Sequence, residues 1–133
     1  MDCRAERSAA PVALLQLDMD RFKTYNDTHG HPAGDVLLQR TAVAWRAELR
    51  GGDLLGRWGG EEFCVLLADC APTAATAVAE RLRVAVPPGS TCSVGLACWE
   101  GGEDAGALVA RADAALYEAK RGGRDRIVLA PTG

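Results

Sequence analysis

The sequence predicts an α/β fold of the α+β type, in which helices flank a mixed central sheet. Short apolar runs suited to buried strands alternate with segments whose apolar residues recur at helical spacing. Two of these runs enclose a Gly-Gly pair, which is typical of a hairpin turn. The chain has 133 residues and a hydrophobic content of 48%, so one core and one domain are expected.

The first half of the chain is expected to form a strand, two helices and a hairpin. Val12 to Leu17 is an apolar run long enough for a buried strand. The second helix is expected from about Ala33 to Arg50, and the hairpin strands at Leu54 to Trp58 and Phe63 to Leu67. The apolar residues of that helix recur at helical spacing: Leu38, Ala42, Trp45 and Leu49.

A helix and a strand are expected next. Thr73 is suited to be the N-cap of the helix, and Pro87-Pro88-Gly89 ends it. Thr91 to Cys98 then predicts a buried strand, in which Gly95 permits the close approach of a neighbouring element.

The last two elements are a helix and a short strand. Asp104 to Arg121 has a helical pattern, and Gly122-Gly123 ends it. Ile127 to Leu129 is expected to complete the sheet.

Composition and charge favour a small domain in a reducing cytoplasm. The net charge of −3 offers no basic surface for a nucleic acid polymer. No apolar run approaches the length of a membrane span, so no membrane contact by this segment is expected, and no signal peptide pattern opens the chain. The cysteines show no metal or disulfide spacing, and Cys64 and Cys92 are expected to be small core residues.

The hairpin segment Arg57 to Phe63 carries the first chemical signal. Gly59 and Gly60 suit the positive φ angles of a tight turn and let a ligand approach the backbone. Glu61 and Glu62 follow directly, and hard cations prefer such oxygen ligands, which indicates a magnesium-assisted phosphate site. The alternative is a solvent-exposed turn that happens to be acidic.

A second acidic cluster ends the first predicted strand. Asp18 and Asp20 lie at its carboxyl end, where sheets of this kind commonly bind ligands. If this strand lies beside the hairpin, Asp18 and Glu61 could share one cation. Both aspartates could instead cap the following helix, and for Asp20 capping is the expected role.

Four motifs in order resemble the GGDEF family of diguanylate cyclases, here with the variant Gly-Gly-Glu-Glu-Phe. They are Leu17 to Asp27, Gly30 to Asp35, Arg57 to Phe63 and Ala112 to Arg124, and the likeness runs from about Leu14 to Leu129. The resemblance implies a palm-like nucleotidyl cyclase fold. It also implies one GGDEF domain over residues 12–130, preceded by a disordered or non-native lead-in over residues 1–11.

The resemblance implies that two GTP molecules are joined into cyclic di-GMP with release of pyrophosphate. Because one domain holds one GTP, a homodimer would be needed for turnover. Asp18, Glu61 and the carbonyl of Met19 correspond to the ligands of Mg²⁺ (or Mn²⁺), and Glu61 and Glu62 to the catalytic carboxylates. Glu62 could assist metal binding or proton removal, and the sequence leaves both open.

The nucleotide contacts are implied in the same way. Asn26 and Asp35 correspond to the residues that read guanine, although alone they would suit a helix cap and a first-turn charge. The triphosphate contacts correspond to Lys23, Lys120, Arg124 and the backbone amides of Arg21 and Phe22.

Arg50 and Asp53 match the family's RxxD motif for inhibition by cyclic di-GMP. Arg81 could supply the second arginine of that allosteric site. Arg can bind phosphate with two parallel hydrogen bonds or stack on guanine, which suits this ligand. The alternative is a helix C-terminal charge at Arg50 and an ordinary loop residue at Asp53.

The chain also departs from the family. It lacks the usual first helix, and the segment between Arg83 and Ser93 is shorter than usual. An N-terminal sensory or dimerising domain, which could be membrane-attached, is therefore expected elsewhere in the protein. A catalytically weak or inactive module that binds GTP or cyclic di-GMP is the alternative function.

Overall fold

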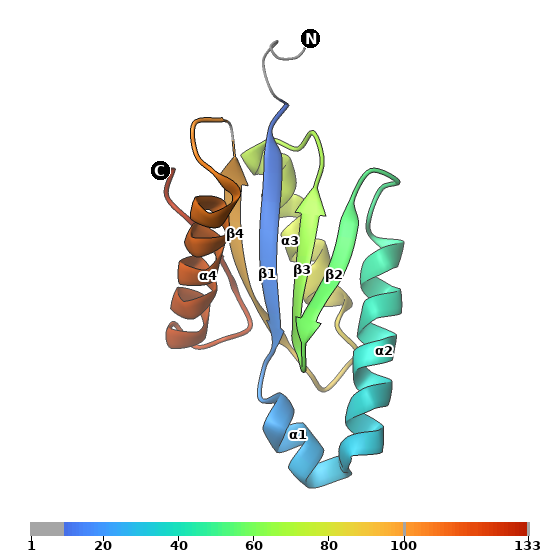
Figure 1. The fold of residues 1–133 in the computed structure, drawn as a ribbon. Helices are drawn as coiled ribbons and strands as arrows, with labels where there is room; N and C mark the ends of the chain where they lie inside the picture. Colours follow the sequence, from blue (N-terminus) through green and yellow to red (C-terminus); the bar gives the residue numbers. More distant parts are fainter. Residues whose placement is uncertain (1–9, 100, 133) are drawn as a thin grey trace.

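The computed structural model describes residues 10–99 and 101–132, which form a five-stranded sheet and four helices (Figure 1). The strands lie in the order β2-β3-β1-β4-β5. In chain order the elements are β1 (Val12–Met19), α1 (Phe22–His29), α2 (His31–Ala47), β2 (Leu54–Gly59), β3 (Glu62–Leu67), α3 (Pro72–Ala85), β4 (Cys92–Trp99), α4 (Ala105–Arg121) and β5 (Ile127–Leu129). This order and the mixed sheet agree with the sequence prediction. No helix of the described residues has the length and apolarity that a bilayer span requires.

Strand β1 is the centre of the sheet. It pairs antiparallel with β3 on one side and with β4 on the other. The β2–β3 hairpin extends one edge, and β5 pairs parallel to β4 at the opposite edge. The sheet is therefore mixed because of a single short strand, β5.

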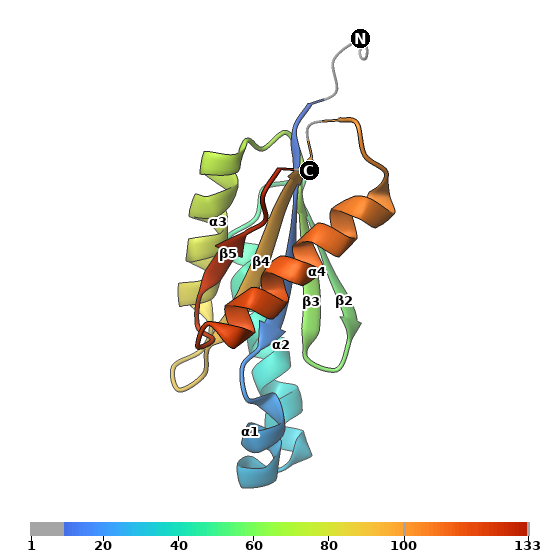
Figure 2. The same cartoon turned by 90° about the vertical axis from the view of Figure 1, so that its left-hand side faces the viewer.

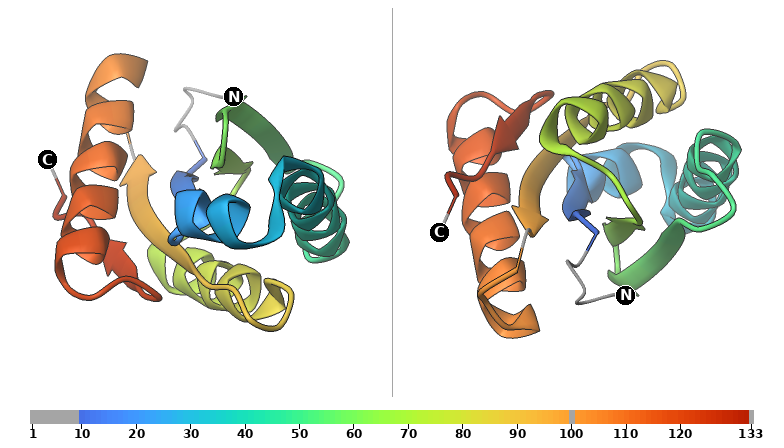
Figure 3. Two further views of the ribbon diagram at one scale, coloured as in Figure 1. Left: turned by 90° about the horizontal axis from the view of Figure 1, so that it is seen from below. Right: turned by 90° about the horizontal axis from the view of Figure 1, so that it is seen from above.

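Helices cover both faces of the sheet. Figure 2 shows α4 crossing one face, and the views in Figure 3 show α2 and α3 on the other. Alternate residues of β1 follow this division: Leu15 and Leu17 pack in the core under α2 and α3, whereas Leu14 packs in the smaller core under α4. Alternation of this kind is what a two-sided strand requires.

Trp45 of α2 links α2 with α3 in the larger core. Its side chain is fully buried, and its indole Nε1 donates a hydrogen bond of 2.8 Å to the Leu82 carbonyl oxygen of α3. Its ring also meets the Phe63 ring edge-on, with centroids 5.1 Å apart. Helix α2 is thereby fixed against both α3 and the start of β3.

Gly95 of β4 permits α4 to approach the sheet closely, as predicted. A Cβ atom there would lie 2.2 Å from the Leu116 backbone nitrogen and 2.3 Å from the Ala112 carbonyl oxygen. Cys92 of the same strand is fully buried, and burial raises the pKa of its thiol. It is a core residue, as expected, while Cys64 is only partly buried against the smaller core.

Three local expectations were wrong. Thr73 is not the N-cap of α3, because the helix begins at Pro72 after Ala71, and proline suits a first helical position. Asp20 does not cap α1, whose N-cap is Arg21 in a left-handed conformation with φ 54° and no side-chain cap. Helix α2 runs from His31 to Ala47 and so lies two to three residues earlier than predicted.

The predicted lead-in over residues 1–11 lies mostly outside the described residues. Of its last two residues, Pro11 accepts a hydrogen bond of 2.9 Å from the Cys70 backbone nitrogen. Between α3 and β4 the chain forms only a short loop containing Pro87-Pro88-Gly89, in line with the shortness noted in the sequence.

Candidate functional site

The end of β1 and the turn of the β2–β3 hairpin lie side by side at one edge of the sheet. Asp18 faces Glu62 in the β1–β3 register, and the Met19 backbone nitrogen donates a hydrogen bond of 3.2 Å to the Glu61 carbonyl oxygen. The turn itself uses φ angles of 151° at Gly59 and 53° at Gly60. The structure therefore brings together the two acidic segments that the sequence marked separately.

Asp18 is the buried carboxylate of this edge, with a relative exposure of 4%. Lys120 of α4 donates a hydrogen bond to its Oδ2 atom, whereas its Oδ1 atom is buried and has no hydrogen-bond partner among the described residues. Burial raises the pKa of Asp18; the hydrogen bond and charge of Lys120 oppose that shift, and the charges of Glu61 and Glu62 add to it. An oxygen atom that binds a cation has no hydrogen-bond partner when the cation is absent, so the buried Oδ1 atom of Asp18 suits a metal ligand.

The residues at this edge of the sheet fit a small, hard cation that takes its remaining ligands from water or from a bound molecule. Among the described residues, no group of three or more His, Cys, Asp or Glu side chains is placed to hold a metal ion. A cation here would therefore depend on Asp18, Glu61, a backbone carbonyl and oxygens from water or a ligand. Mg²⁺ is commonly bound in this way, through one or two carboxylates plus phosphate oxygens.

Two residues beside the GGEEF segment hold its turn in place. The Arg57 Nε atom donates a hydrogen bond of 2.9 Å to the Gly60 carbonyl oxygen. The guanidinium carbon Cζ of Arg57 lies 5.8 Å from the Phe63 ring centroid. The Trp58 indole Nε1 donates a hydrogen bond of 2.7 Å to the side-chain oxygen of Gln16, a buried residue of β1. The Trp58 contact could not be predicted from the sequence, because Gln16 becomes its neighbour only in the folded sheet, whereas the Arg57 contact is local to the turn.

A cavity of about 270 Å³ lies between the hairpin and α4. Glu62 and Lys120 line it, so two of the predicted site residues face one space from opposite elements. The exposed aromatic side chains of Trp58 and Tyr117 also line it. This cavity does not include the predicted guanine contacts.

The predicted guanine contacts, Asn26 and Asp35, lie on α1 and α2. The Oδ1 atom of Asn26 is buried without a hydrogen-bond partner among the described residues. Gly34 makes room for it, since a Cβ atom at that position would lie only 1.8 Å from this oxygen. Asp35 follows Gly34 directly and is exposed at the first turns of α2.

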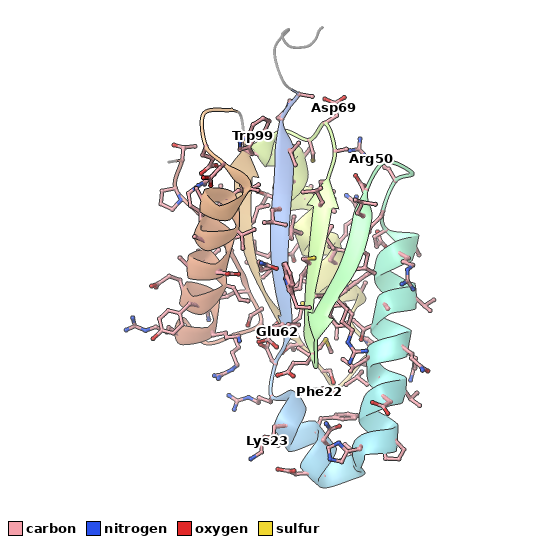
Figure 4. The ribbon with its side chains drawn as sticks, viewed as in Figure 1. Phe22, Lys23, Arg50, Glu62, Asp69 and Trp99 are labelled. Carbon is pink, nitrogen blue, oxygen red and sulfur yellow. The ribbon has the colours of Figure 1, made fainter. Side chains whose placement is uncertain are left out.

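The start of α1 lies just beyond the GGEEF hairpin. Figure 4 shows Phe22 and Lys23 at the same end of the molecule as Glu62. Phe22 is buried, while Arg21 and Lys23 are exposed. The first amides of a helix have no intrahelical partner, so those at this helix start are available to an anion.

Arg124 follows α4, which also carries Lys120. Its backbone nitrogen donates a hydrogen bond of 3.0 Å to the Ala119 carbonyl oxygen, and its φ angle is 64°. The structure thus places Lys120 and Arg124, two of the predicted triphosphate residues, at the exit of α4.

The predicted allosteric residues lie at the opposite end of the β2–β3 hairpin, where Figure 4 shows Arg50. The Arg50 Nη2 atom donates a hydrogen bond of 2.7 Å to the Ala68 carbonyl oxygen, and its Nε lies 3.6 Å from the Asp53 Oδ2 atom. Asp53 is buried, with 2% of its side chain exposed, and it accepts hydrogen bonds from the backbone nitrogens of Arg50 and Ala68. Arg81 pairs separately with Glu48 at 3.2 Å.

Known proteins are similar to this chain in sequence and in fold. Residues 2–126 match the family model described as "Diguanylate cyclase, GGDEF domain". Diguanylate cyclase DgcP of Pseudomonas aeruginosa is 43% identical over 96% of this chain and 20% of its own length. The chain spans about a fifth to a third of the length of the curated relatives it matches.

Two solved structures are similar in both sequence and fold. The diguanylate cyclase SiaD of Pseudomonas aeruginosa, solved in complex with its activator SiaC, is 45% identical with a TM-score of 0.84; the match covers 90% of this chain and 50% of that one. The GGDEF domain of DgcB from Caulobacter crescentus, solved in complex with c-di-GMP, is 33% identical with a TM-score of 0.85 and coverages of 90% and 77%. By sequence, by fold and by the Gly-Gly-Glu-Glu-Phe turn, this chain belongs to the GGDEF domain family of diguanylate cyclases.

Proposed function

We propose that this domain is a diguanylate cyclase, which joins two GTP molecules into cyclic di-GMP and releases two pyrophosphates. The observation that carries the proposal is the Oδ1 atom of Asp18 beside the GGEEF turn, which is buried and finds no hydrogen-bond partner within residues 10–99 and 101–132. An orphaned carboxylate oxygen costs stability, on the order of 1–3 kcal/mol, unless a ligand uses it. The family membership and the names of the relatives support the same reaction.

Asp18, Glu61 and the Met19 carbonyl would hold Mg²⁺ or Mn²⁺. When bound, such an ion lowers the pKa of the attacking 3′-hydroxyl and neutralises charge that develops on the α-phosphate. Glu62 faces the cavity shared with Lys120, so it is suited either to assist metal binding or to accept the hydroxyl proton. In each half of the reaction the 3′-oxygen of one GTP bonds to the α-phosphorus of the other, and pyrophosphate leaves.

Asn26 and Asp35 would select guanine. The Asp35 carboxylate can accept two hydrogen bonds from N1–H and the amino group of guanine. Adenine lacks that paired donor edge, so Asp35 would make neither of these two hydrogen bonds with adenine. The buried Oδ1 atom of Asn26 is a hydrogen-bond acceptor that has no partner among the described residues, so it could accept a hydrogen bond from a further donor of the nucleotide.

Lys23, Lys120, Arg124 and the amides of Arg21 and Phe22 would bind the triphosphate. Lys120 already contacts Asp18, so a single cationic side chain links the metal carboxylate with the side of the site nearest to α4. The helix start after Arg21 and the Lys120 side chain of α4 both lie near this carboxylate, which suits a chain of phosphates that contacts both.

One domain holds one GTP, so we propose that two domains face each other during turnover. The input that controls their meeting would come from a further domain or from a partner protein. SiaD supports this view, since it was solved in complex with an activator. GTP as the substrate implies a cytoplasmic location for the reaction.

We propose that Arg50, Asp53 and Arg81 bind cyclic di-GMP and inhibit turnover. Asp53 is buried and fixes the backbone of the loop, while the Arg50 side chain is 63% exposed and so is available to a phosphate. The GGDEF domain of DgcB in complex with c-di-GMP supports binding of this ligand by the family.

The test is detection of cyclic di-GMP by chromatography after the domain, fused to a dimerising zipper, is incubated with GTP and Mg²⁺. We expect product from the native sequence and none from Glu62→Gln. Glu118→Gln, the same change at an exposed position on α4, is the matched control and should keep activity. A folded fusion that makes no product would contradict the proposal, and GTP binding by calorimetry would then support the alternative of a binding module.

A further inference from the structure

The carboxylate of Asp20 joins three segments that are far apart in the sequence. Its Oδ1 atom accepts a hydrogen bond of 2.6 Å from the Ser93 hydroxyl, and its Oδ2 atom accepts one of 2.6 Å from the Thr91 hydroxyl. The Oδ2 atom also accepts a hydrogen bond of 2.9 Å from the Asp125 backbone nitrogen. Asp20 thus connects the end of β1, the start of β4 and the turn after α4.

That turn contains three consecutive residues with positive φ angles. They are 122° at Gly123, 64° at Arg124 and 47° at Asp125. For a residue with a Cβ atom, the left-handed conformation is strained, so Arg124 and Asp125 each need support from their surroundings. Strained residues of this kind persist where neighbouring contacts over-determine them.

Several contacts support the turn. The Gly123 backbone nitrogen donates a hydrogen bond of 3.4 Å to the Lys120 carbonyl oxygen, and the Arg126 Nε atom donates one of 3.0 Å to the Arg124 carbonyl oxygen. The Asp125 backbone nitrogen is held by Asp20, and its carboxylate accepts a hydrogen bond of 2.7 Å from the Arg83 Nη1 atom of α3. The Arg124 backbone nitrogen is held by the Ala119 carbonyl at the end of α4. Of these contacts, only the one to Asp20 comes from the chain segment that also carries Asp18.

We propose that Asp20 is a positioning residue, which holds the turn of residues 123–125 in its strained form and so orients Arg124 toward the triphosphate. Loss of its carboxylate would leave the Asp125 amide unpaired and let Arg124 and Asp125 relax to ordinary φ angles. The Arg124 side chain would then leave the exit of α4. The part of this inference that concerns the triphosphate rests on the proposed function.

Two measurements on purified protein test the two parts separately. Amide hydrogen exchange reports on the turn without any nucleotide, and we expect Asp20→Ala to speed exchange at residues 123–126. Calorimetry with GTP and with GMP reports on the phosphates. We expect Asp20→Ala to weaken GTP binding about tenfold, as for a lost charged hydrogen bond, and to change GMP binding much less. Asp27→Ala, at an exposed position on α1, is the matched control and should change neither.

A double variant separates positioning from a general loss of structure. If Asp20 acts through Arg124, Asp20→Ala should weaken GTP binding no further once Arg124→Ala is present. Asp20→Asn keeps a hydrogen-bond acceptor of the same shape and should restore most of the affinity. If Asp20→Ala does not fold, Asp20→Ser keeps a polar group but is too short for all three donors, and the same results are expected from it.

Unchanged exchange at residues 123–126 would overturn the inference, as would effects of Asp20→Ala and Arg124→Ala that simply add. Faster exchange in a protein whose native form does not bind GTP would overturn the proposed function and the triphosphate part, and would leave Asp20 as the support of the turn alone.

Discussion

Gly34→Ala should raise the stability of the fold while it weakens nucleotide binding. Gly34 lies inside α2, and an added Cβ atom would lie 1.8 Å from the Asn26 Oδ1 atom, 2.9 Å from the Asn26 Cγ atom and 3.1 Å from the Phe22 Cζ atom. The first two atoms belong to the end of a flexible side chain, which can rotate away. The Phe22 ring needs to move by only a few tenths of an ångström.

The sign of the stability change follows from two contributions. Alanine is favoured over glycine inside a helix by about 0.5–1 kcal/mol. In the native protein the displaced Asn26 oxygen is buried and has no partner in the described part of the chain, so its move into water removes a cost of about 1–3 kcal/mol. After the adjustment of Phe22, we expect a gain of about 1 kcal/mol in the free energy of unfolding. The lost base contact should weaken GTP binding by about tenfold.

Urea denaturation and GTP calorimetry measure the two quantities on the same samples. Asn26→Ala removes the same side-chain oxygen and should reproduce the loss of affinity with Gly34 unchanged. If Gly34→Ala lowers the free energy of unfolding by about 1 kcal/mol or more, the expectation that Asn26 and Phe22 make room for the new methyl group is refuted. Unchanged GTP affinity would refute the role of Asn26.

Four further outcomes are expected. Gly95→Ala should lower the free energy of unfolding by about 3 kcal/mol, because the new methyl group meets backbone atoms of α4, and Gly51→Ala, with no atom of the described chain within 4 Å, should change it little in the same urea titration. Arg50→Ala should abolish inhibition by cyclic di-GMP and keep turnover, whereas Arg40→Ala should leave inhibition intact in the same assay. Specific activity of the unfused domain should rise with protein concentration, and a constant value at dilute protein would contradict the facing dimer. Asp18→Asn should make the metal-free protein more stable at neutral pH, measured by denaturation in the presence of a chelator.

The pH dependence of that last effect follows from the direction of the Asp18 pKa shift. The folded protein raises this pKa above the ordinary value of 3.8, mainly through burial. The contribution of Asp18 to stability is therefore full below pH 3.8 and is lost as the pH rises through the folded-state pKa. The advantage of Asp18→Asn should shrink as the pH falls toward 3.8, and an advantage that grew instead would contradict the shift.

Local patterns were sufficient to predict most of the architecture. Apolar runs and hydrophobic periodicity located the long strands and helix α2, since each of these buries one face or two in the core around the same sheet. The role of Gly95 was also predictable, because a glycine inside an apolar strand commonly marks the close approach of another backbone.

The sequence could not predict the partners of polar side chains. Asp20 looks like a helix cap in sequence, but in the fold it has stronger donors in Thr91, Ser93 and Asp125, more than seventy positions away. The N-cap of α3 is Ala71 and not Thr73, because Pro72 suits the first helical position, so the helix starts two residues earlier than expected.

The candidate site was predictable in its residue types and not in its contacts. Asp18 and Glu61 could be paired on chemistry alone, but the Lys120 contact with Asp18 depends on how β1 and α4 meet, and the Trp58 contact with Gln16 depends on how β2 and β1 lie in the sheet. Contacts of this kind come from the register of the strands, which no local pattern specifies.

The edge strand β5 gives the domain a mechanical weak point. It has three residues, it pairs only with β4 among the described strands, and the hydrogen bond from the Ala130 backbone nitrogen to the Leu96 carbonyl closes its far end. Both ends of the described chain leave the sheet at the same side, opposite to the GGEEF turn (Figure 1). Tension applied between them would load the bonds of β5 one after another, from Ala130 toward Arg126. The structure released next would be the turn that carries Arg124, so a pulled domain should lose the proposed contact of Arg124 with the triphosphate while its core is still folded.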